Sequence, residues 1–230
     1  MTEKKPPVVA VIIPALNEEE SIGKVVRAIP RLASRTVVVD NGSTDRTAAA
    51  AREAGAMVVR EERKGYGHAC LRGMEEVRDA DIIVFLDGDF SDFPEEMPLL
   101  VAPIAEGRAD MVIGSRMRGR RQRAAMAPQS LVANAFFSWV LRLYGMRVTD
   151  IGPFRAIRAQ ALFSLDMKEV TYGWTVEMMV KAARRHMRVV EVPVSYRRRL
   201  GRSKVSGSAI ASLKAAARMT YTLLRYSRGG

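Results

Sequence analysis

Two carboxylates at the end of a predicted buried strand are the residues whose spacing most directly suggests chemistry. Residues 82–86 are five consecutive apolar residues, and Asp87-Gly88-Asp89 follows at once. Buried strands avoid charge unless something neutralises it. Two acids at this position suit a hard divalent cation, and Gly88 would let the backbone approach a ligand closely. The alternative is a polar Asp-Gly turn that closes the strand, and this stretch alone leaves both interpretations open.

Polar residues also follow the other predicted strands. Apolar runs at residues 8–13 and 36–39 predict two more strands, which end at Pro14 and Asp40. Further strands are expected at residues 57–60, 111–114 and 189–194, with helical segments between most of them. This alternation predicts an α/β fold with a mostly parallel sheet and helices on both faces. Ligands of such sheets bind beyond the carboxyl ends of the strands, where these polar residues would gather.

The composition narrows the class of protein. The chain has 230 residues, 48% of them hydrophobic, so it can bury a sizeable core. The net charge of +12 indicates a polyanionic partner: nucleic acid, a phosphorylated ligand or an anionic membrane. A single cysteine, Cys70, excludes an internal disulfide. No signal peptide or strongly apolar run of spanning length is evident, and no G-x-G-x-x-G follows the first strand. We therefore expect a cytoplasmic protein that is not a dehydrogenase.

Two basic segments each precede an amphipathic helix. A cluster of arginines between Arg116 and Arg123 comes before a wide apolar stripe at residues 131–143. Residues 197–204 form a second basic loop before a helix expected at residues 207–226. The stripe either packs on the sheet or forms an interfacial helix whose basic neighbours attract anionic lipid. Membrane contact, if present, would then be peripheral, on the inner face.

An ordered set of motifs resembles the family 2 glycosyltransferases with the GT-A fold. The motifs are Pro14-Ala15-Leu16-Asn17-Glu18, residues 39–45, Asp87-Gly88-Asp89, Gly114-Ser115-Arg116, Thr149-Asp150 with Pro153-Phe154-Arg155, Trp174 to Glu177, and Gly201-Arg202-Ser203-Lys204. The later motifs look like the branch of dolichyl-phosphate mannose synthases and bacterial polyprenyl-phosphate glycosyltransferases. The resemblance implies a single GT-A, Rossmann-like domain over residues 1–206 and a C-terminal basic amphipathic helix over residues 207–230.

The resemblance also implies roles for individual residues. Asp40 would contact the base of a nucleotide sugar, with Ala15 and Glu18 near the base and ribose. Asp87 and Asp89 would hold the diphosphate through Mg²⁺ or Mn²⁺. The implied nucleotide-sugar site comprises Pro14, Ala15, Asn17, Glu18, Asp40, Lys64, Asp87, Gly88, Arg202 and Lys204. The branch usually has a glutamine where Ser91 stands, so the third metal ligand is open, with Asp92 as a candidate substitute.

The implied catalytic residues depend on the acceptor. Arg116 would receive the phosphate of a polyprenyl acceptor, which is already an anionic nucleophile and needs no strong base. A hydroxyl acceptor would need a carboxylate to take its proton, and Asp150 and Glu177 are the candidates. A turn residue and a first-turn helix acid are the ordinary alternatives for these two. Together with Asp89, these residues form the implied catalytic set.

The sequence leaves several functions in competition. The first is an inverting transfer of a hexose from a UDP- or GDP-sugar to a polyprenyl or dolichyl phosphate. The second uses a soluble hydroxyl acceptor, and a third is a nucleotidyltransferase, which the stretch from Asp150 to Lys204 fits poorly. A nucleic-acid-binding protein is disfavoured, because carboxylates at successive strand ends would repel a phosphate backbone. The base, the sugar and the oligomeric state are not specified by the sequence.

Overall fold

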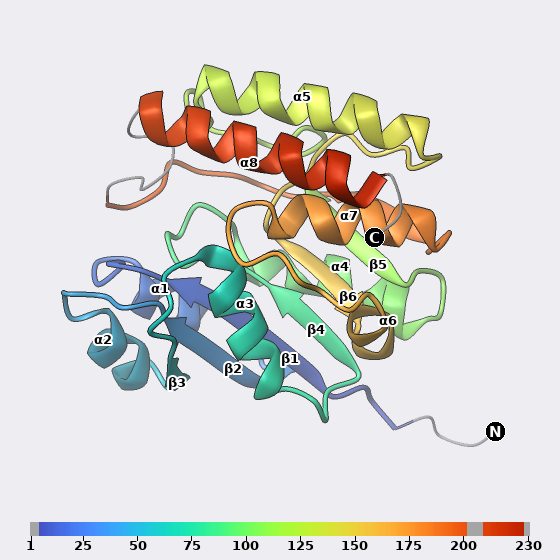
Figure 1. The fold of residues 1–230 in the computed structure, drawn as a ribbon. Coiled ribbons are helices and arrows are strands. Elements are labelled where there is room, and N and C mark those ends of the chain that lie inside the picture. The colour runs from blue at the N-terminus through green and yellow to red at the C-terminus, as the bar shows by residue number, and fades with distance from the viewer. Residues whose placement is uncertain (1–4, 202–208, 228–230) are drawn as a thin grey trace.

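A seven-stranded sheet forms the centre of the molecule (Figure 1). The computed structural model describes residues 5–201 and 209–227, with side chains for residues 5–201 and 217–226. The strands are β1 (Val9–Ala15), β2 (Ala33–Asp40), β3 (Met57–Arg60), β4 (Ile82–Phe85), β5 (Met111–Ser115), β6 (Arg155–Arg158) and β7 (Val189–Pro193). Their order is β3-β2-β1-β4-β6-β5-β7. Among these described strands, β6 alone runs antiparallel to its neighbours, β4 and β5. The predicted α/β class with a mostly parallel sheet is confirmed.

Strand β6 is one of the elements that the sequence pattern did not predict. Two of its four residues are arginines, which conceal the apolar pattern of a buried strand. Arg155 is nevertheless 1% exposed, because its guanidinium donates to the carbonyl oxygens of Ile151 (3.0 Å) and Gly152. Hydrogen bonds to backbone carbonyls offset part of the cost of burying a charge. The loop before β6 therefore supplies hydrogen-bond acceptors for the buried guanidinium at the first residue of the strand.

Helices cover both faces of the sheet. They are α1 (Ile22–Ala28), α2 (Thr47–Glu53), α3 (Tyr66–Glu75), the 3₁₀ turn η1 (Pro94–Glu96), α4 (Met97–Ala105), α5 (Pro128–Leu143), α6 (Ala159–Ser164), α7 (Trp174–Arg184) and α8 (Ala209–Ser227). One hydrophobic core lies between the sheet and α1, α2 and α4, and the other between the sheet and α3, α6 and α7. Helices α5 and α8 both contact α7, and Figure 1 shows them on its side away from the sheet.

An aromatic cluster fixes α7 against the sheet below the carboxyl end of β4. Trp174, at the start of α7, is 1% exposed and packs edge-to-face on Phe85 of β4, with ring centroids 4.7 Å apart. Tyr66 at the start of α3 contacts the same indole at 6.3 Å. Such pairs add stabilisation beyond the area that they bury. They place the first turns of α3 and α7 beside the strand that leads to Asp87.

The apolar stripe of α5 is divided between the core and the surface. Phe137, Val140 and Leu141 are buried, whereas Val132, Trp139 and Leu143 are 71%, 57% and 68% exposed. Packing within the fold therefore accounts for only part of the stripe. In the part of the chain that the structure describes, no helix has the length and apolar character needed to cross a membrane.

Candidate active site

Several of the predicted site residues lie together at the carboxyl ends of β1, β2 and β4. Ala15 of β1 lies opposite Asp40 of β2 in the parallel register, and the Asn41 amide donates to the Ala15 carbonyl at 2.9 Å. A Cβ atom added to Gly88 would lie 3.4 Å from Ile22 and 3.6 Å from the Ala15 side chain. The turn after β4 therefore packs directly against the end of β1. The tertiary structure brings together Ala15, Asp40 and Gly88, which are far apart in the sequence.

Asp87 and Asp89 form an electrostatically strained pair at this edge. Burial, followed by the charge of Asp89, raises the pKa of Asp87 to about 7. The Tyr66 hydroxyl donates weakly to Asp87 at 3.4 Å. A divalent cation between the two carboxylates would relieve both the repulsion and the lost hydration, so the donor set fits Mg²⁺ or Mn²⁺. Two carboxylates suffice for such an ion when substrate phosphates and water complete its shell.

Asp92, the candidate third metal ligand, is buried within reach of the charges of Asp87 and Asp89. Both of its carboxylate oxygens are buried without a hydrogen-bond partner among the described residues, and burial raises its pKa well above the ordinary value. Yet the described residues contain no group of three or more histidine, cysteine, aspartate or glutamate side chains with metal-binding geometry. The substitution of Asp92 for the family glutamine therefore stays a prediction.

A second acidic pair at the site is bridged by an arginine that the sequence interpretation did not single out. Arg199 contacts Glu18 Oε1 at 2.8 Å and Asp89 Oδ2 at 3.2 Å. Asp89 Oδ1 also accepts hydrogen bonds from the amide and hydroxyl of Ser91, at 2.9 and 2.5 Å. The sequence showed only that residues 197–204 are basic. It could not show which carboxylates Arg199 contacts, because Glu18 lies 181 residues away in the chain.

Side-chain hydrogen bonds tie the loops after β1 and β2 together. The amide of Thr44 donates to Asn17 Oδ1 at 2.8 Å, and Ser43 Oγ accepts from the Asn17 amide at 3.0 Å. The Asp40 carboxylate accepts from the Ser43 amide at 2.9 Å. Asn17 has φ +52°, a left-handed conformation that asparagine tolerates better than most residues. Asp40 and Asn17 therefore shape the rim of the site through these loop contacts.

Asn41 positions the loop that carries Lys64, a role that the sequence did not indicate. Its amide group donates to the carbonyls of Glu61 (3.1 Å) and Arg63 (2.9 Å). Its side-chain oxygen accepts from the Gly65 amide at 2.8 Å. Lys64 lies near Gly42, since a Cβ atom there would be 3.9 Å from the lysine Cε. The predicted phosphate ligand Lys64 is thus near the loop that follows Asp40.

Asp150 and Arg116 form one buried unit. The Arg116 side chain donates to both carboxylate oxygens of Asp150, at 2.9 and 2.8 Å, and its own amide donates to Oδ2 at 2.8 Å. The Asp150 side chain is fully buried and that of Arg116 is 12% exposed. Burial lowers the pKa of Arg116, but the bond to Asp150 outweighs it and leaves that pKa above its usual range. Asp150 is therefore placed to orient Arg116, and neither carboxylate oxygen is free of that pairing.

Glu177 lies in the first turn of α7 and makes internal contacts. Its fully buried carboxylate accepts from the amides of Lys168 and Glu169, and pairs with Lys181 at 2.6 Å. These contacts fix the loop that precedes α7. They are contacts expected of a helix first-turn acid, and the role of Glu177 as catalytic base stays a prediction. Arg202 and Lys204 lie outside the described residues.

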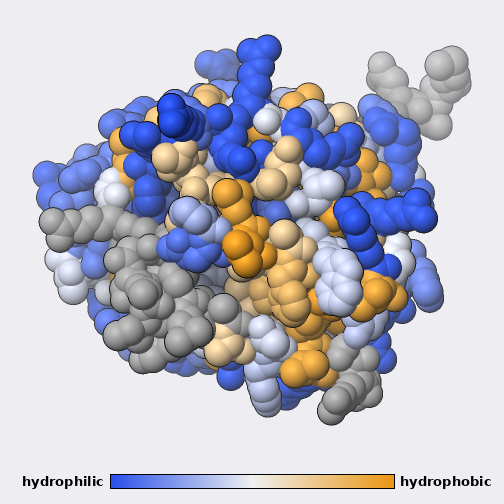
Figure 2. All heavy atoms as spheres, turned by 90° about the horizontal axis from the view of Figure 1, so that it is seen from above, coloured by the Kyte–Doolittle hydropathy of each residue, from blue (hydrophilic) through white to orange (hydrophobic). Residues whose placement is uncertain are grey.

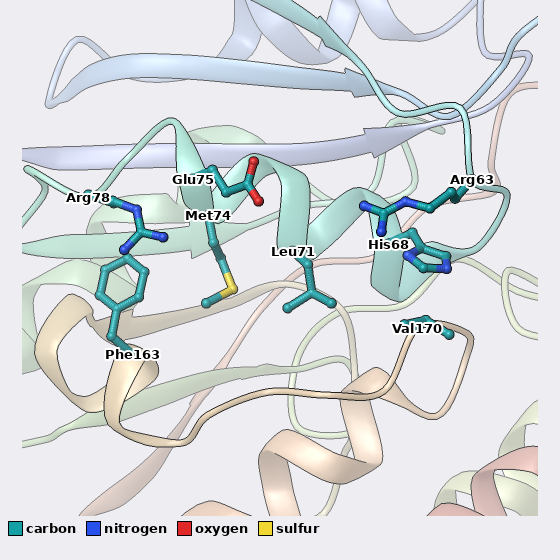
Figure 3. A pocket seen from close by; sticks show the side chains of 8 residues that line it. All are labelled: Arg63, His68, Leu71, Met74, Glu75, Arg78, Phe163 and Val170. Atoms are coloured by element: carbon teal, nitrogen blue, oxygen red, sulfur yellow. The ribbon is translucent and has the colours of Figure 1, made fainter.

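A separate cavity of about 330 Å³ lies along α3 (Figure 3). It is lined by Arg63, His68, Leu71, Met74, Glu75, Arg78, Phe163 and Val170. Arg63 and His68 lie at one end near Val170, and Arg78 lies over the Phe163 ring, 5.8 Å from its centroid, at the other. None of these residues belongs to the predicted nucleotide-sugar or catalytic sets.

Comparison with known proteins identifies the family. Residues 10–171 match the family described as "Glycosyl transferase family 2". The chain belongs to glycosyl transferase family 2. It is 42% identical to an uncharacterized glycosyltransferase of Mycobacterium tuberculosis over 89% of this chain and 93% of that protein.

Other relatives of this glycosyltransferase carry more specific names. It is 34% identical to the undecaprenyl-phosphate mannosyltransferase of Micrococcus luteus, over 88% of this chain and 89% of that protein. It is 32% identical to the dolichyl-phosphate hexose transferase of Haloferax volcanii, over 89% of this chain and 90% of that protein. These relatives support the predicted polyprenyl-phosphate branch of the family.

A solved structure supports the predicted fold. Glucosyl-3-phosphoglycerate synthase of Mycobacterium tuberculosis, in complex with Mn²⁺, UDP-glucose and phosphoglyceric acid, aligns with a TM-score of 0.78. The match covers 96% of this chain and 79% of that one, at 23% identity. At this identity the match shows that the two proteins share a fold, and it does not identify the substrates of this glycosyltransferase.

The raised pKa of Asp87 predicts a pH dependence of stability. The folded glycosyltransferase holds a proton on Asp87 up to about pH 7, whereas the unfolded chain releases it near 3.8. Between these values the folded state binds more protons, so the free energy of unfolding falls as pH rises, by at most about 1.4 kcal/mol per pH unit from this group. Asp87→Asn should flatten this fall, as measured by urea unfolding across that pH range. An identical pH slope in the variant would contradict the raised pKa.

The contacts of Glu177 predict a structural effect of its substitution. Glu177→Gln should lower the free energy of unfolding by about 2 kcal/mol, because it weakens a buried charge pair with Lys181. Urea unfolding measures this loss, and turnover should be normalised to the folded fraction. A variant of unchanged stability with abolished turnover would instead identify Glu177 as the catalytic base.

Proposed function

We propose that this glycosyltransferase transfers a hexose, with inversion, from a UDP- or GDP-sugar to a polyprenyl or dolichyl phosphate at the cytoplasmic face of a membrane. The observation that carries the proposal is the state of the two candidate bases. Asp150 is fully paired with Arg116, and Glu177 with the loop before α7 and Lys181. A lipid phosphate is already an anionic nucleophile and needs no strong base. A hydroxyl acceptor would require one of these carboxylates to leave its partners.

The surface of α5 and α8 offers a place for a lipid acceptor. Figure 2, which looks down on this side of the molecule, shows apolar side chains gathered together with hydrophilic ones around them. Among the side chains that the structure describes, the exposed large apolar residues of the two helices are Val132, Phe136, Trp139, Leu143, Tyr221 and Leu224. Exposed apolar patches of this kind mark protein or membrane contacts. We define these six residues as the apolar face.

Basic residues accompany the apolar face. The exposed arginines of α5, of the loop before it and of α8 include Arg118, Arg120, Arg121, Arg123, Arg142 and Arg225. Each basic residue near an anionic membrane contributes about 1 kcal/mol to attachment, so several together can hold a protein there. The names of the relatives from Micrococcus luteus and Haloferax volcanii support the same acceptor class.

The carboxyl ends of β1, β2 and β4 supply the donor site in this proposal. Asp40, Ala15 and Glu18 take the nucleoside, and Lys64, Arg202 and Lys204 are the candidate phosphate ligands. Asp87 and Asp89 hold Mg²⁺ or Mn²⁺, which when bound stabilises the negative charge that develops on the departing diphosphate. Arg116, oriented by Asp150, receives the acceptor phosphate. A soluble acceptor is the competing proposal, and the fold shared with a phosphoglyceric acid complex is the observation in its favour.

The donor assignment predicts a selective binding defect. Asp40→Ala should weaken UDP or GDP binding about tenfold, because it removes a carboxylate that lies beside Ala15 at the predicted base site. Calorimetric titration with each nucleotide in the presence of Mn²⁺ measures the effect. Glu53→Ala, on the surface of α2, serves as a control for the loss of one negative charge. Unchanged nucleotide affinity would remove Asp40 from the site.

The acceptor assignment is tested by matched acceptors and by vesicles. We expect transfer to a short polyprenyl phosphate and none to a soluble sugar or phosphoglyceric acid. We also expect binding to anionic vesicles that weakens as salt rises. Phe136→Ser with Trp139→Ser should reduce sedimentation with vesicles about tenfold, since each lost aromatic contact with the bilayer costs about 1 kcal/mol or more.

The control variant is Leu99→Ser, which removes a 49% exposed leucine from α4 on the opposite face of the sheet. It should sediment with vesicles as the unmodified protein does. Efficient use of a soluble acceptor, without transfer to the lipid phosphate and without sedimentation, would replace this proposal with the soluble-acceptor enzyme.

A further inference from the structure

Arg199 reaches from the segment after β7 into the predicted metal site. Its two terminal nitrogens contact Glu18 Oε1 at 2.8 Å and Asp89 Oδ2 at 3.2 Å. The side chains of Glu18 and Asp89 are only 9% and 10% exposed, and that of Arg199 is 27% exposed. A charge pair with so little water around it is screened much less than a surface pair. The contact is therefore energetically significant for both carboxylates.

The backbone on either side of Arg199 is held against the turn after β4. The Leu200 amide donates to the Asp89 carbonyl at 3.0 Å, and the Arg197 amide to the Ser91 carbonyl at 2.9 Å. The Arg197 guanidinium lies over the Phe90 and Phe93 rings, 3.4 and 4.1 Å from their centroids. These contacts on the neighbouring residues deliver the Arg199 side chain to Asp89 in one orientation.

One nitrogen of the Arg199 guanidinium lacks a hydrogen bond to any described residue, which makes its ion pair with Asp89 easier to replace by another cation. Its Nε is buried without a hydrogen-bond partner among the described residues. A buried donor without a partner loses its hydration and gains no hydrogen bond in return. The ion pair with Asp89 therefore carries an internal penalty that a different cation at Asp89 would not carry.

A divalent cation and Arg199 require the same part of Asp89. Oδ1 is already bonded to the Ser91 amide and hydroxyl, so Oδ2 is the oxygen with the capacity for a cation. Oδ2 is also the atom that Arg199 contacts. Two cations at one carboxylate oxygen repel each other, and the low exposure of the site strengthens the repulsion.

We infer that Arg199 competes with the divalent cation for Asp89, so that metal binding releases Arg199 and loosens residues 197–200 from the turn after β4. The inference rests on the proposed assignment of Asp89 as a metal ligand and does not depend on the acceptor. Arg199 is then a positioning residue, which holds Asp89 and Glu18 in place until the cation arrives. Because linkage is reciprocal, the factor by which the cation weakens the Arg199 contact is also the factor by which that contact weakens metal binding.

The test measures Mn²⁺ affinity on the full chain, without donor or acceptor, from the electron paramagnetic resonance signal of free Mn²⁺. Arg199→Gln removes the competing charge and should lower the Mn²⁺ dissociation constant about fivefold or more, a typical coupling between linked sites. Arg199→Lys keeps the charge and should stay close to the unmodified protein. Arg198→Gln is the matched control, because the Arg198 guanidinium donates to the Arg123 carbonyl and does not contact Asp89.

A second measurement uses the unmodified chain, so that it does not depend on the folding of a variant. Saturating Mn²⁺ alone should accelerate tryptic cleavage within residues 197–199, since cleavage requires local opening of the segment. Equal Mn²⁺ affinity in Arg199→Gln and the unmodified protein, or cleavage that Mn²⁺ does not accelerate, would overturn this inference alone. A chain that binds no Mn²⁺ would overturn the metal assignment and this inference with it, whatever the acceptor experiments show.

Discussion

The concentration of carboxylates at one edge of the sheet is the constraint on which the rest of this structure depends. Glu18, Asp89 and Asp150 are buried, and Asp87 is half-buried, at the carboxyl ends of buried strands or in the loops beside them. A carboxylate in such a place must be neutralised or its pKa rises, as it does for Asp87. The arginines of the later half of the chain supply the neutralising charge. Part of the excess positive charge of the protein therefore neutralises carboxylates at the site, and the rest lies on the surface.

The two arginine pairs at this edge act differently because their geometries differ. Arg116 donates to both oxygens of Asp150, and that pair gives each partner a fixed orientation. Arg199 divides its two terminal nitrogens between Glu18 and Asp89 and leaves Nε without a partner in the described part of the chain. Bidentate pairs are strong and specific, whereas a divided contact is easier to exchange. One pair suits a fixed acceptor site, and the other suits a site that must admit a cation.

The proposed donor and acceptor sites belong to different parts of the fold. The donor site lies on loops after β1, β2 and β4, which the parallel register and the hydrogen bonds of Asn17 and Asn41 hold in place. The apolar face belongs to α5 and α8, which contact the fold through α7. Arg116 follows β5 and precedes α5, so it occupies the connection between the two regions. Its position supports a role in which the acceptor phosphate meets the sugar there.

The sequence by itself determined those features that depend on residues adjacent in the chain. Continuous apolar runs predicted β1, β2 and β4, and the acidic turns after them predicted the location of the site, because burial and turn chemistry depend on adjacent residues. The tertiary structure decided the charge partners. Carbonyls of the loop before β6 accept hydrogen bonds from Arg155. Asp150 pairs with Arg116, and Arg199 reaches Glu18 across 181 residues. A sequence shows how many charges a chain carries, but which of them meet in a low-dielectric site is fixed only when distant segments pack together.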